Sequence, residues 1–335
     1  MRSPMLNSLR EWGERRSTRV FALKIAQKRL EFERVCTVTK NTLMLDFKGI
    51  EMRLSEKCAV CLYDKQKKLV QDEDYLAEVR ELLENRDPED TSPYMVYLFD
   101  RAFVSRFGDQ GETSRYRAIK QTFNDLVLSM EDAVRQRIEA AEDPLAASVL
   151  FARIGNYIDF GTMHDVSKET FLGLFDDPKM GESDRRTYHS FLKECAKAKS
   201  FLLIADNCGE IVLDKLFLEQ LAKRFPQLEM YVLVRGDTVL NDVTPEEAAY
   251  VGIDRMATIV SNGAAIPGTV YRMLSEDARR ILDTADVILA KGQGNYESLS
   301  NQGRHIFYVF LCKCDLFTWR FQVPRLTGMF VEEES

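Results

Sequence analysis

The sequence has few histidines, no excess of positive charge and no long hydrophobic run. Its 335 residues include 3 histidines, and 46 Lys and Arg stand against 53 Asp and Glu, for a net charge of −7. A negative chain lacks the basic face that contacts to nucleic-acid phosphates require, so we expect no nucleic-acid partner. The longest apolar runs, such as 307–312, are far too short to cross a bilayer, and we expect no membrane association.

The cysteines do not form the pattern of a disulfide framework. There are 7, an odd number, and they are scattered along the chain. Small secreted domains instead carry an even set at close spacing. The arginine-rich first residues also lack the apolar core of a secretory signal. A cytoplasmic location is therefore expected, where thiols stay reduced.

Several enzyme signatures are missing. A dinucleotide fingerprint requires GxGxxG after the first strand, and Gly292 and Gly294 form only a lone GxG after a later strand. The same gap argues against a glycine-rich loop for a methyl donor. Neither the P-loop pattern nor the GxSxG elbow occurs, which excludes those two nucleotide and ester-hydrolase classes.

Three regions are expected along the chain: an extension of unknown role (1–51), a mainly helical subdomain (52–198) and an α/β subdomain (199–335). Apolar residues at helical spacing predict one helix over 114–141. Asp143 and Pro144 are typical of an N-cap and a first-turn proline. Further helices are predicted at 150–157, 168–175 and 184–197.

The α/β subdomain is expected to be a three-layer α/β/α core with a mostly parallel sheet. Short apolar runs predict buried strands at 201–205, 230–234, 257–260, 287–290 and 306–311. Between them lie predicted helices at 211–224, from the capping-box residue Thr244 onward, and at 269–283 with a break near Ser275. Strands that alternate with helices form parallel sheets covered on both faces.

Polar segments follow the first four predicted strands, at 206–210, 235–244, 261–263 and 291–295. In a parallel sheet these strand ends share one edge, where open α/β folds bind their ligands. Four polar loops are therefore expected to converge on one site.

The chemistry of these loops suits phosphoryl groups. Asp206, Asn207 and Asp242 offer hard oxygen ligands for a divalent cation. Lys291 offers a positive charge for a phosphate. The backbone amides of Ser261, Asn262 and Gly263 could cradle an anion. A cation, a lysine and an amide cradle are the groups that phosphoryl transfer uses.

Ordinary structural roles are the alternative. An Asp-Asn pair after a strand is often a turn and helix cap, Asp242 could open the turn before Thr244, and Lys291 could be a solvated strand-end residue. The convergence of four loops favours a site. Cys208 could be a nucleophile, but no histidine lies near it in sequence, which favours a small packing residue. His164 could approach the site from a polar loop, and a solvated or core histidine is the favoured alternative.

A second metal site is a separate hypothesis. Cys58 and Cys61 form a CxxC, and Cys312 and Cys314 form a CxC. Together they could hold zinc through four sulfurs, although the two pairs are far apart in sequence. Buried or surface thiols are the alternative.

The ordered set of motifs resembles the damage-control phosphatase family, also called domain-of-unknown-function family 89, and is most similar to its stand-alone prokaryotic branch. The residues that carry the resemblance are Cys58-Ala-Val-Cys61-Leu62, Asp143-Pro144, 155–161, 205–210, 234–236, 240–244, Pro267-Gly268-Thr269 and 290–297. The segment 261–266 departs from the serine-glycine-acidic pattern, so the substrate stays open.

The resemblance implies a divalent metal bound by Asp206, Asn207 and Asp242 and a phosphate contact from Lys291. It also implies that Asn156, Asp159 and Arg235 line the same pocket. Together these expectations predict a metal-dependent phosphatase of small phosphorylated metabolites, such as sugar phosphates or damaged phospho-metabolites. The expected ion is Mn²⁺, Co²⁺, Ni²⁺ or Mg²⁺. Two alternatives remain: a metal-dependent transferase or methyltransferase on the same fold, and a non-catalytic metal- or ligand-binding protein. The oligomeric state cannot be inferred.

Overall fold

The computed structural model describes residues 54–156 and 180–334. By its internal contacts the chain divides into two units, Met1–Ile50 and Glu51–Ser335, and every described residue belongs to the second. The predicted helix at 168–175 lies outside the described residues.

A six-stranded sheet forms the centre of the described fold, in the order β3-β2-β1-β4-β5-β6. Strands β1 to β5 run parallel to one another, and β6 pairs antiparallel with β5. The strands are β1 (Ser200–Ile204), β2 (Glu229–Val234), β3 (Thr258–Ser261), β4 (Val287–Lys291), β5 (Ile306–Leu311) and β6 (Gly328–Glu333). The predicted parallel strands are confirmed, and β6 is an addition that the sequence did not indicate.

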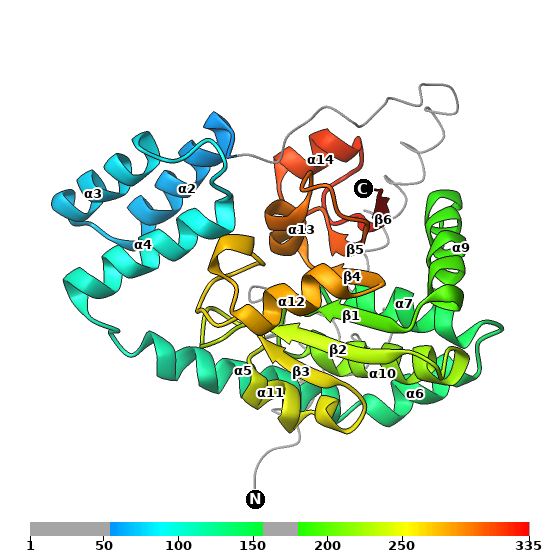
Figure 1. Ribbon diagram of the computed structural model, residues 1–335. Coiled ribbons are helices and arrows are strands. Elements are labelled where there is room, and N and C mark those ends of the chain that lie inside the picture. Colours follow the sequence, from blue (N-terminus) through cyan, green and yellow to red (C-terminus); the bar gives the residue numbers. More distant parts are fainter. Residues whose placement is uncertain (1–53, 157–179, 335) are drawn as a thin grey trace, which may run out of the picture. The chain divides into compact units, whose positions relative to one another are not determined.

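Helices cover both faces of this sheet, as Figure 1 shows. One apolar core joins the sheet to helices on one side, and a second core joins it to helices on the other. On the first side lie α5 (Glu112–Leu128), α6 (Glu131–Glu139), α7 (Pro144–Gly155), α9 (Glu182–Lys197), α10 (Glu210–Arg224) and α11 (Pro245–Tyr250). On the second lie α12 (Glu276–Thr284), α13 (Gln293–Leu299) and α14 (Asp315–Phe321). The three-layer α/β/α class is confirmed.

Predicted caps begin two of these helices. Asp143 accepts a hydrogen bond from the amide of Ala146, and Pro144 occupies the first turn of α7. Thr244 and Glu247 form the capping box of α11. Ser275 is the N-cap of α12, so the predicted break there is also correct.

The single helix predicted over 114–141 is wrong, because the chain breaks between α5 and α6. The hydroxyl of Ser129 donates to the carbonyl of Leu126 at 2.6 Å, and such a local bond competes with continued helix. Met130 then starts α6 with φ −117° and ψ −1°. Val127 and Val134 are both fully buried, so the apolar periodicity survives the break and concealed it in the sequence.

Helices α2 (Glu56–Leu69), α3 (Glu73–Glu84) and α4 (Ser92–Phe107) have an apolar core of their own. Ser55, Asp72 and Thr91 cap their first turns. An ion pair between Arg272 and the buried Asp90 links this core to the segment before α12, and the Arg272 guanidinium lies 4.0 Å from the centroid of the Tyr94 ring. Cation and ring at this distance attract each other.

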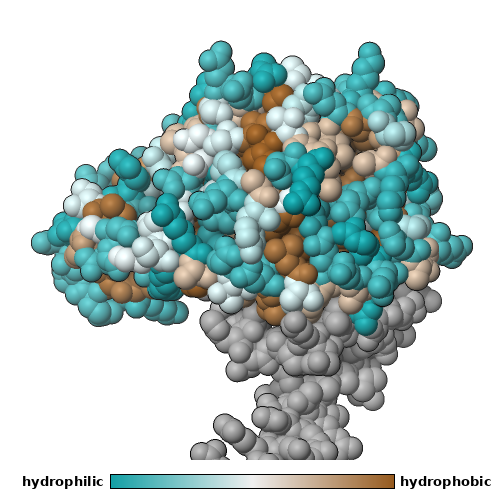
Figure 2. Space-filling model, turned by 90° about the horizontal axis from the view of Figure 1, so that it is seen from below, coloured by the Kyte–Doolittle hydropathy of each residue, from teal (hydrophilic) through white to brown (hydrophobic). Residues whose placement is uncertain are grey.

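The surface in Figure 2 is mainly hydrophilic, and its hydrophobic side chains form separate patches rather than one broad face. Scattered apolar side chains are ordinary on protein surfaces. Within 54–156 and 180–334, no helix combines the length and apolar character needed to cross a bilayer.

Candidate functional site

The loops after β1 and β2 are joined at the carboxyl edge of the sheet. Asn207 and Asp242 form an isolated antiparallel bridge, and the amide of Val243 donates to the carbonyl of Asp206 at 2.9 Å. Cys208 donates in the same way to Asn241. These bonds bring the predicted oxygen set of Asp206, Asn207 and Asp242 together.

The side chain of Arg235 lies against the same carboxylates. Its Nε donates to Asp242 Oδ2 at 2.7 Å, and its Nη2 lies 3.8 Å from Asp206 Oδ1. Asn295 and Thr269 accept from the other guanidinium nitrogens. Arg235 is fully buried, so its geometry is set by these partners.

The electrostatics of the site favour an added cation. Burial raises the pKa of Asp206 to about 8, and the neighbouring carboxylates of Glu210 and Asp242 add to the effect. Burial also raises the pKa of Asp242, although Arg235 acts against it. Carboxylates crowded together in this way are costly to ionise without further positive charge.

The donor atoms fit a hard divalent ion. All three side chains of the predicted set present oxygen, which suits Mg²⁺ or Mn²⁺. The amide oxygen of Asn156 is buried beside them and has no hydrogen-bond partner among the described residues. A buried acceptor without a donor is what a hydrated cation or a substrate hydroxyl would satisfy. Asp206, Asn207 and Asp242 are thus the residues that would hold the metal.

Lys291 has different partners from the phosphate that was predicted. Its Nζ bonds Glu210 Oε1 at 2.5 Å, Asp214 Oδ1 at 2.7 Å and the carbonyl of Ala152 at 3.1 Å. Burial acts to lower the pKa of Lys291, but Asp214 and Glu210 outweigh it and hold that pKa above its ordinary value. The contact with phosphate stays a prediction, and it would require one of these bonds to break.

Glu210 is a site residue that the sequence did not single out. It is fully buried at the start of α10, and its Oε2 accepts from the side-chain amides of Asn156 (2.9 Å) and Asn207 (3.3 Å). Its place in Asp-Asn-Cys-Gly-Glu, one residue into a helix, looks like an ordinary first-turn acid. Only the three-dimensional structure shows that it faces the ligand set.

The loop after β3 lies beside the Arg235 loop, but its amides are already used. Asn262 Oδ1 accepts from the amides of Gly236 (2.7 Å) and Ala264 (2.9 Å). The amide of Gly263 donates to Ser261 Oγ, and that of Asn262 donates to the carbonyl of Val234. The anion cradle at Ser261, Asn262 and Gly263 therefore stays a prediction, and in this structure the loop serves to hold its neighbour.

Lys313 is a second residue that the sequence did not single out. It follows β5 at the same edge, is partly buried, and its backbone amide donates to Gln293 Oε1 at 3.1 Å. Against the effect of burial, the charge of Lys313 acts to lower the pKa of both Asp206 and Asp242, so its ammonium lies within electrostatic range of them. The strand-end rule that located the first four loops also applies to this fifth loop.

Asp159 and His164 lie outside the described residues. Burial raises the pKa of the Cys208 thiol well above its ordinary value, which argues against a thiolate nucleophile.

The four-sulfur zinc site is not formed. Cys58 interacts electrostatically with Cys314, yet the described residues contain no group of three or more His, Cys, Asp or Glu side chains placed to hold a metal. Burial raises the pKa of Cys312 to about 12, as expected for an inert thiol.

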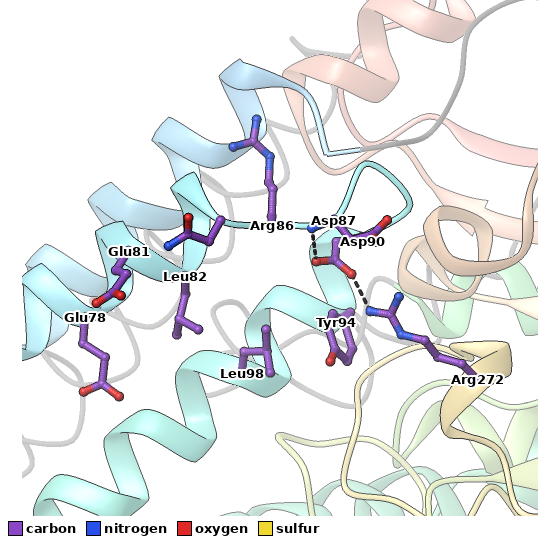
Figure 3. Close-up of a pocket in the computed structure, with 10 residues that line it drawn as sticks. Glu78, Glu81, Leu82, Arg86, Asp87, Asp90, Tyr94, Leu98 and Arg272 are labelled. Carbon is purple, nitrogen blue, oxygen red and sulfur yellow. Dashed lines mark hydrogen bonds and ion pairs between the residues drawn. The ribbon is translucent and has the colours of Figure 1, made fainter.

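A cavity of about 560 Å³ lies elsewhere, between α3, α4 and Arg272 (Figure 3). Its wall includes the Arg272–Asp90 pair and the Tyr94 ring. None of the predicted site residues lines it, so cavity size does not mark the candidate site in this protein.

Comparison with known proteins agrees with the geometry. The family model described as "Damage-control phosphatase ARMT1-like domain" matches residues 53–325. An uncharacterized protein of Methanocaldococcus jannaschii is 28% identical over 292 residues, covering 81% of this chain and 93% of its own. A protein of Archaeoglobus fulgidus named damage-control phosphatase is 28% identical over 276 residues, covering 79% and 93%.

A solved structure shares the fold. The crystal structure of a DUF89 family protein from Pyrococcus horikoshii superposes with a TM-score of 0.66 at 23% identity, covering 84% of this chain and 99% of that one. The family model spans most of the chain, including every described loop of the candidate site. The chain therefore belongs to the damage-control phosphatase family with an ARMT1-like domain.

Proposed function

We propose that the protein is a metal-dependent phosphatase of small phosphorylated metabolites. The observation that carries this proposal is the convergence of Asp206, Asn207 and Asp242 at one sheet edge, linked by the bridge between Asn207 and Asp242. Family membership and the relative named damage-control phosphatase support the same activity.

A divalent ion held by the three oxygen ligands would act as a Lewis acid on a phosphoryl oxygen. Arg235 orients Asp242 through its Nε and keeps Asp206 in place with its Nη2. Lys313 is partly buried at the carboxyl edge of the sheet, and its charge already acts on Asp206 and Asp242. It is therefore placed to neutralise a phosphoryl oxygen bound beside them. Such fixed charges stabilise the transition state because they need no reorganisation during the reaction.

The nucleophile is either Asp206 or a water molecule. Attack by Asp206 in line with the leaving oxygen would form an acyl phosphate that water then hydrolyses. Attack by water would release phosphate in one step. A single turnover in ¹⁸O-labelled water, with a search for phosphorylated Asp206, distinguishes these two routes.

Small esters such as sugar phosphates are the proposed substrates, and Mn²⁺, Co²⁺, Ni²⁺ or Mg²⁺ the proposed ions. The buried amide oxygen of Asn156 beside the carboxylates could accept a hydrogen bond from a substrate hydroxyl. A cytoplasmic setting is part of this proposal, since phosphorylated metabolites are found there.

Phosphate release from a panel of sugar phosphates tests the proposal. Each ester is supplied with one of the four ions or with a chelator, using the native protein and Asp206→Ala. Release that needs the ion and is lost in Asp206→Ala is the expected result. Removing a group of this kind commonly lowers kcat by about 10²-fold or more.

The matched control is Asp237→Ala. Asp237 is an exposed carboxylate on the loop that also carries Arg235, so its loss removes a charge of the same sign near the edge. Turnover close to that of the native protein is expected. Absence of release with every ion, from protein shown to be folded and metal-loaded, would contradict the phosphatase proposal and favour a binding protein or a transferase.

A further inference from the structure

Lys291 is surrounded by acceptors on every N–H. An ammonium group has three donors, and in Lys291 these meet Glu210, Asp214 and the carbonyl of Ala152. Its side chain is 1% exposed, and those of Glu210 and Asp214 are 0% and 1% exposed. A buried ion pair with complete hydrogen bonding is held rigidly, because breaking it leaves an uncompensated charge.

Glu210 passes this order to the ligand set. While Oε1 meets Lys291, Oε2 accepts from the amide nitrogens of Asn156 and Asn207. The same two nitrogens donate to Asp206 Oδ2, at 3.0 Å and 2.7 Å. Glu210 Oε2 and Asp206 Oδ2 are the acceptors in all four bonds, so both amides turn their nitrogens toward this pair of acids.

The orientation of Asn207 follows from these bonds. With Nδ2 fixed between Glu210 and Asp206, its oxygen Oδ1 is the atom that remains for a cation. An amide that flipped would present nitrogen, which cannot bind a metal ion as an oxygen does.

We infer that Lys291 is a positioning residue, which acts through Glu210 on the amide of Asn207. It does not contact phosphate, and its role is to keep an oxygen atom aimed at the metal position. This inference rests on the proposed function for the presence of a metal, but it assigns Lys291 a different task from the phosphate contact that the family resemblance implied.

The two roles predict opposite signs in binding experiments. Removal of a positive charge near a cation site should, by simple repulsion, leave cation affinity unchanged or tighter. Loss of a positioning residue should instead weaken it, since supporting partners of metal ligands commonly contribute 10–100-fold in affinity. A phosphate contact would show itself in phosphate affinity alone.

The experiment measures two dissociation constants in Lys291→Met: that of Mn²⁺ without phosphate, and that of inorganic phosphate with Mn²⁺ at saturation. We expect Mn²⁺ binding to weaken by about 10-fold or more, with phosphate binding changed by less than about threefold once the site is filled. Unchanged or tighter Mn²⁺ binding, or a phosphate affinity that alone falls, would overturn the inference.

Lys215→Met is the matched control. Lys215, on α10, is buried like Lys291. Its Nζ lies 2.7 Å from a carboxylate oxygen of Glu131 and donates to the carbonyl of Val251. Its loss also removes a charged partner from a partly buried carboxylate, so we expect a loss of stability here as well, but Mn²⁺ affinity should stay within about twofold of the native value. An equal loss in both variants would mean that Lys291 acts only on general stability, which also overturns the inference.

Glu210→Gln is the second variant, and it decides the matter if Lys291→Met does not fold. It keeps the pair between Lys291 and Asp214 but replaces the acceptor that orders the amides. Weaker Mn²⁺ binding supports positioning. Native Mn²⁺ affinity with tighter phosphate binding would show that a released Lys291 meets phosphate.

These binding measurements are separate from turnover. If the native protein hydrolyses no ester but Mn²⁺ affinity falls as stated, the phosphatase proposal fails and the positioning role of Lys291 stands. If the native protein binds no divalent ion at millimolar concentration, the positioning inference is overturned as well.

Discussion

At the scale of single residues, burial makes the carboxyl groups of Asp206 and Asp242 resist ionisation. Because the pKa of Asp206 is raised to about 8, a proton occupies it through most of the physiological range. A cation must displace that proton, so its apparent affinity falls as the pH falls below 8. The protonation of Asp206 thus sets how the affinity of the site for a cation depends on pH.

We therefore expect Mn²⁺ to bind more tightly at pH 8 than at pH 6, with protons released on binding. Titration calorimetry in two buffers of different ionisation enthalpy would measure both quantities. Asp206→Asn removes this titrating group and should bind weakly, with a smaller dependence on pH than the native protein. Equal affinity of the native protein at pH 6 and pH 8 would contradict the raised pKa.

Gly292 illustrates how closely the backbone approaches these carboxylates. A Cβ placed on it would lie 2.0 Å from Asp206 Oδ2, and its φ is +79°. We expect Gly292→Ala to abolish cation binding, because Asp206 has to move. Gly303→Ala is the control, since Gly303 also has positive φ (+67°) but open space around it. It should lose only about 1–2 kcal/mol of stability, from backbone strain. Chemical denaturation and Mn²⁺ titration of both variants separate these effects.

At this scale the sequence was informative about residue type and less so about side-chain direction. Asp206, Asn207 and Asp242 were located because they lie in polar loops after recognisable strands, and Arg235 was placed in the pocket by the family resemblance. The partners of Lys291 could not be predicted, since Glu210 and Asp214 lie far from it in sequence and meet it only through the packing of α10 against β4. Lys313 could not be singled out, because its neighbours Cys312 and Cys314 do not form a polar segment like those after the first four strands.

At the scale of elements, α7 is an important support for the site. Its last turn ends at Asn156, and its Ala152 carbonyl accepts from Lys291. Asp143 caps the opposite end and also accepts from the hydroxyl of Tyr188 at 3.0 Å. The cap therefore stabilises a helix on which two site contacts depend.

Asp143→Ala should lower the free energy of unfolding by about 1–2 kcal/mol, the typical effect of losing an N-cap. Urea denaturation at pH 7 measures this change. Asp143→Asn retains an acceptor for the Ala146 amide and should lose much less. Equal destabilisation by both variants would assign the effect to the carboxylate charge near Arg224 rather than to the cap.

Strands were easier to predict than helix boundaries. The buried parallel strands are continuous apolar runs, whereas β6 combines Gly328 and two glutamates and is mostly half-buried. Its pairing depends on the edge of β5 that faces away from β4, and a local sequence pattern does not encode such a contact. The break at Ser129 was hidden because helical periodicity continued on both sides of it.

At the scale of the whole molecule, the described chain contains two apolar cores that include the sheet and a third core that does not. Helices α2, α3 and α4 share a core that is separate from the two cores on the sheet. The ion pair of Arg272 with Asp90 is a charged link between this part and the α/β part. Regions with separate cores commonly open with different free energies.

Arg272→Met should increase amide hydrogen exchange in α3 and α4 while β1 and β4 keep native protection. The reason is that Asp90, 5% exposed, would lose its charged partner and keep the bond from the Asp87 amide, at a cost of about 1–3 kcal/mol. Exchange followed by mass spectrometry measures the change. The control is Arg280→Met, which removes an exposed arginine on α12 and should change nothing. Faster exchange in the sheet as well would show a single cooperative unit.

The bridge between Asn207 and Asp242 means that the two loops after the neighbouring strands β1 and β2 supply every oxygen of the proposed metal set. The segment 261–269 comes from a later crossover and contributes none of them. Libraries that randomise its half-buried positions Ala264 and Ala265 could therefore alter substrate choice while the ion stays bound. The fold thus places the residues that would hold the ion and the loop that departs from the family pattern on different segments of the chain.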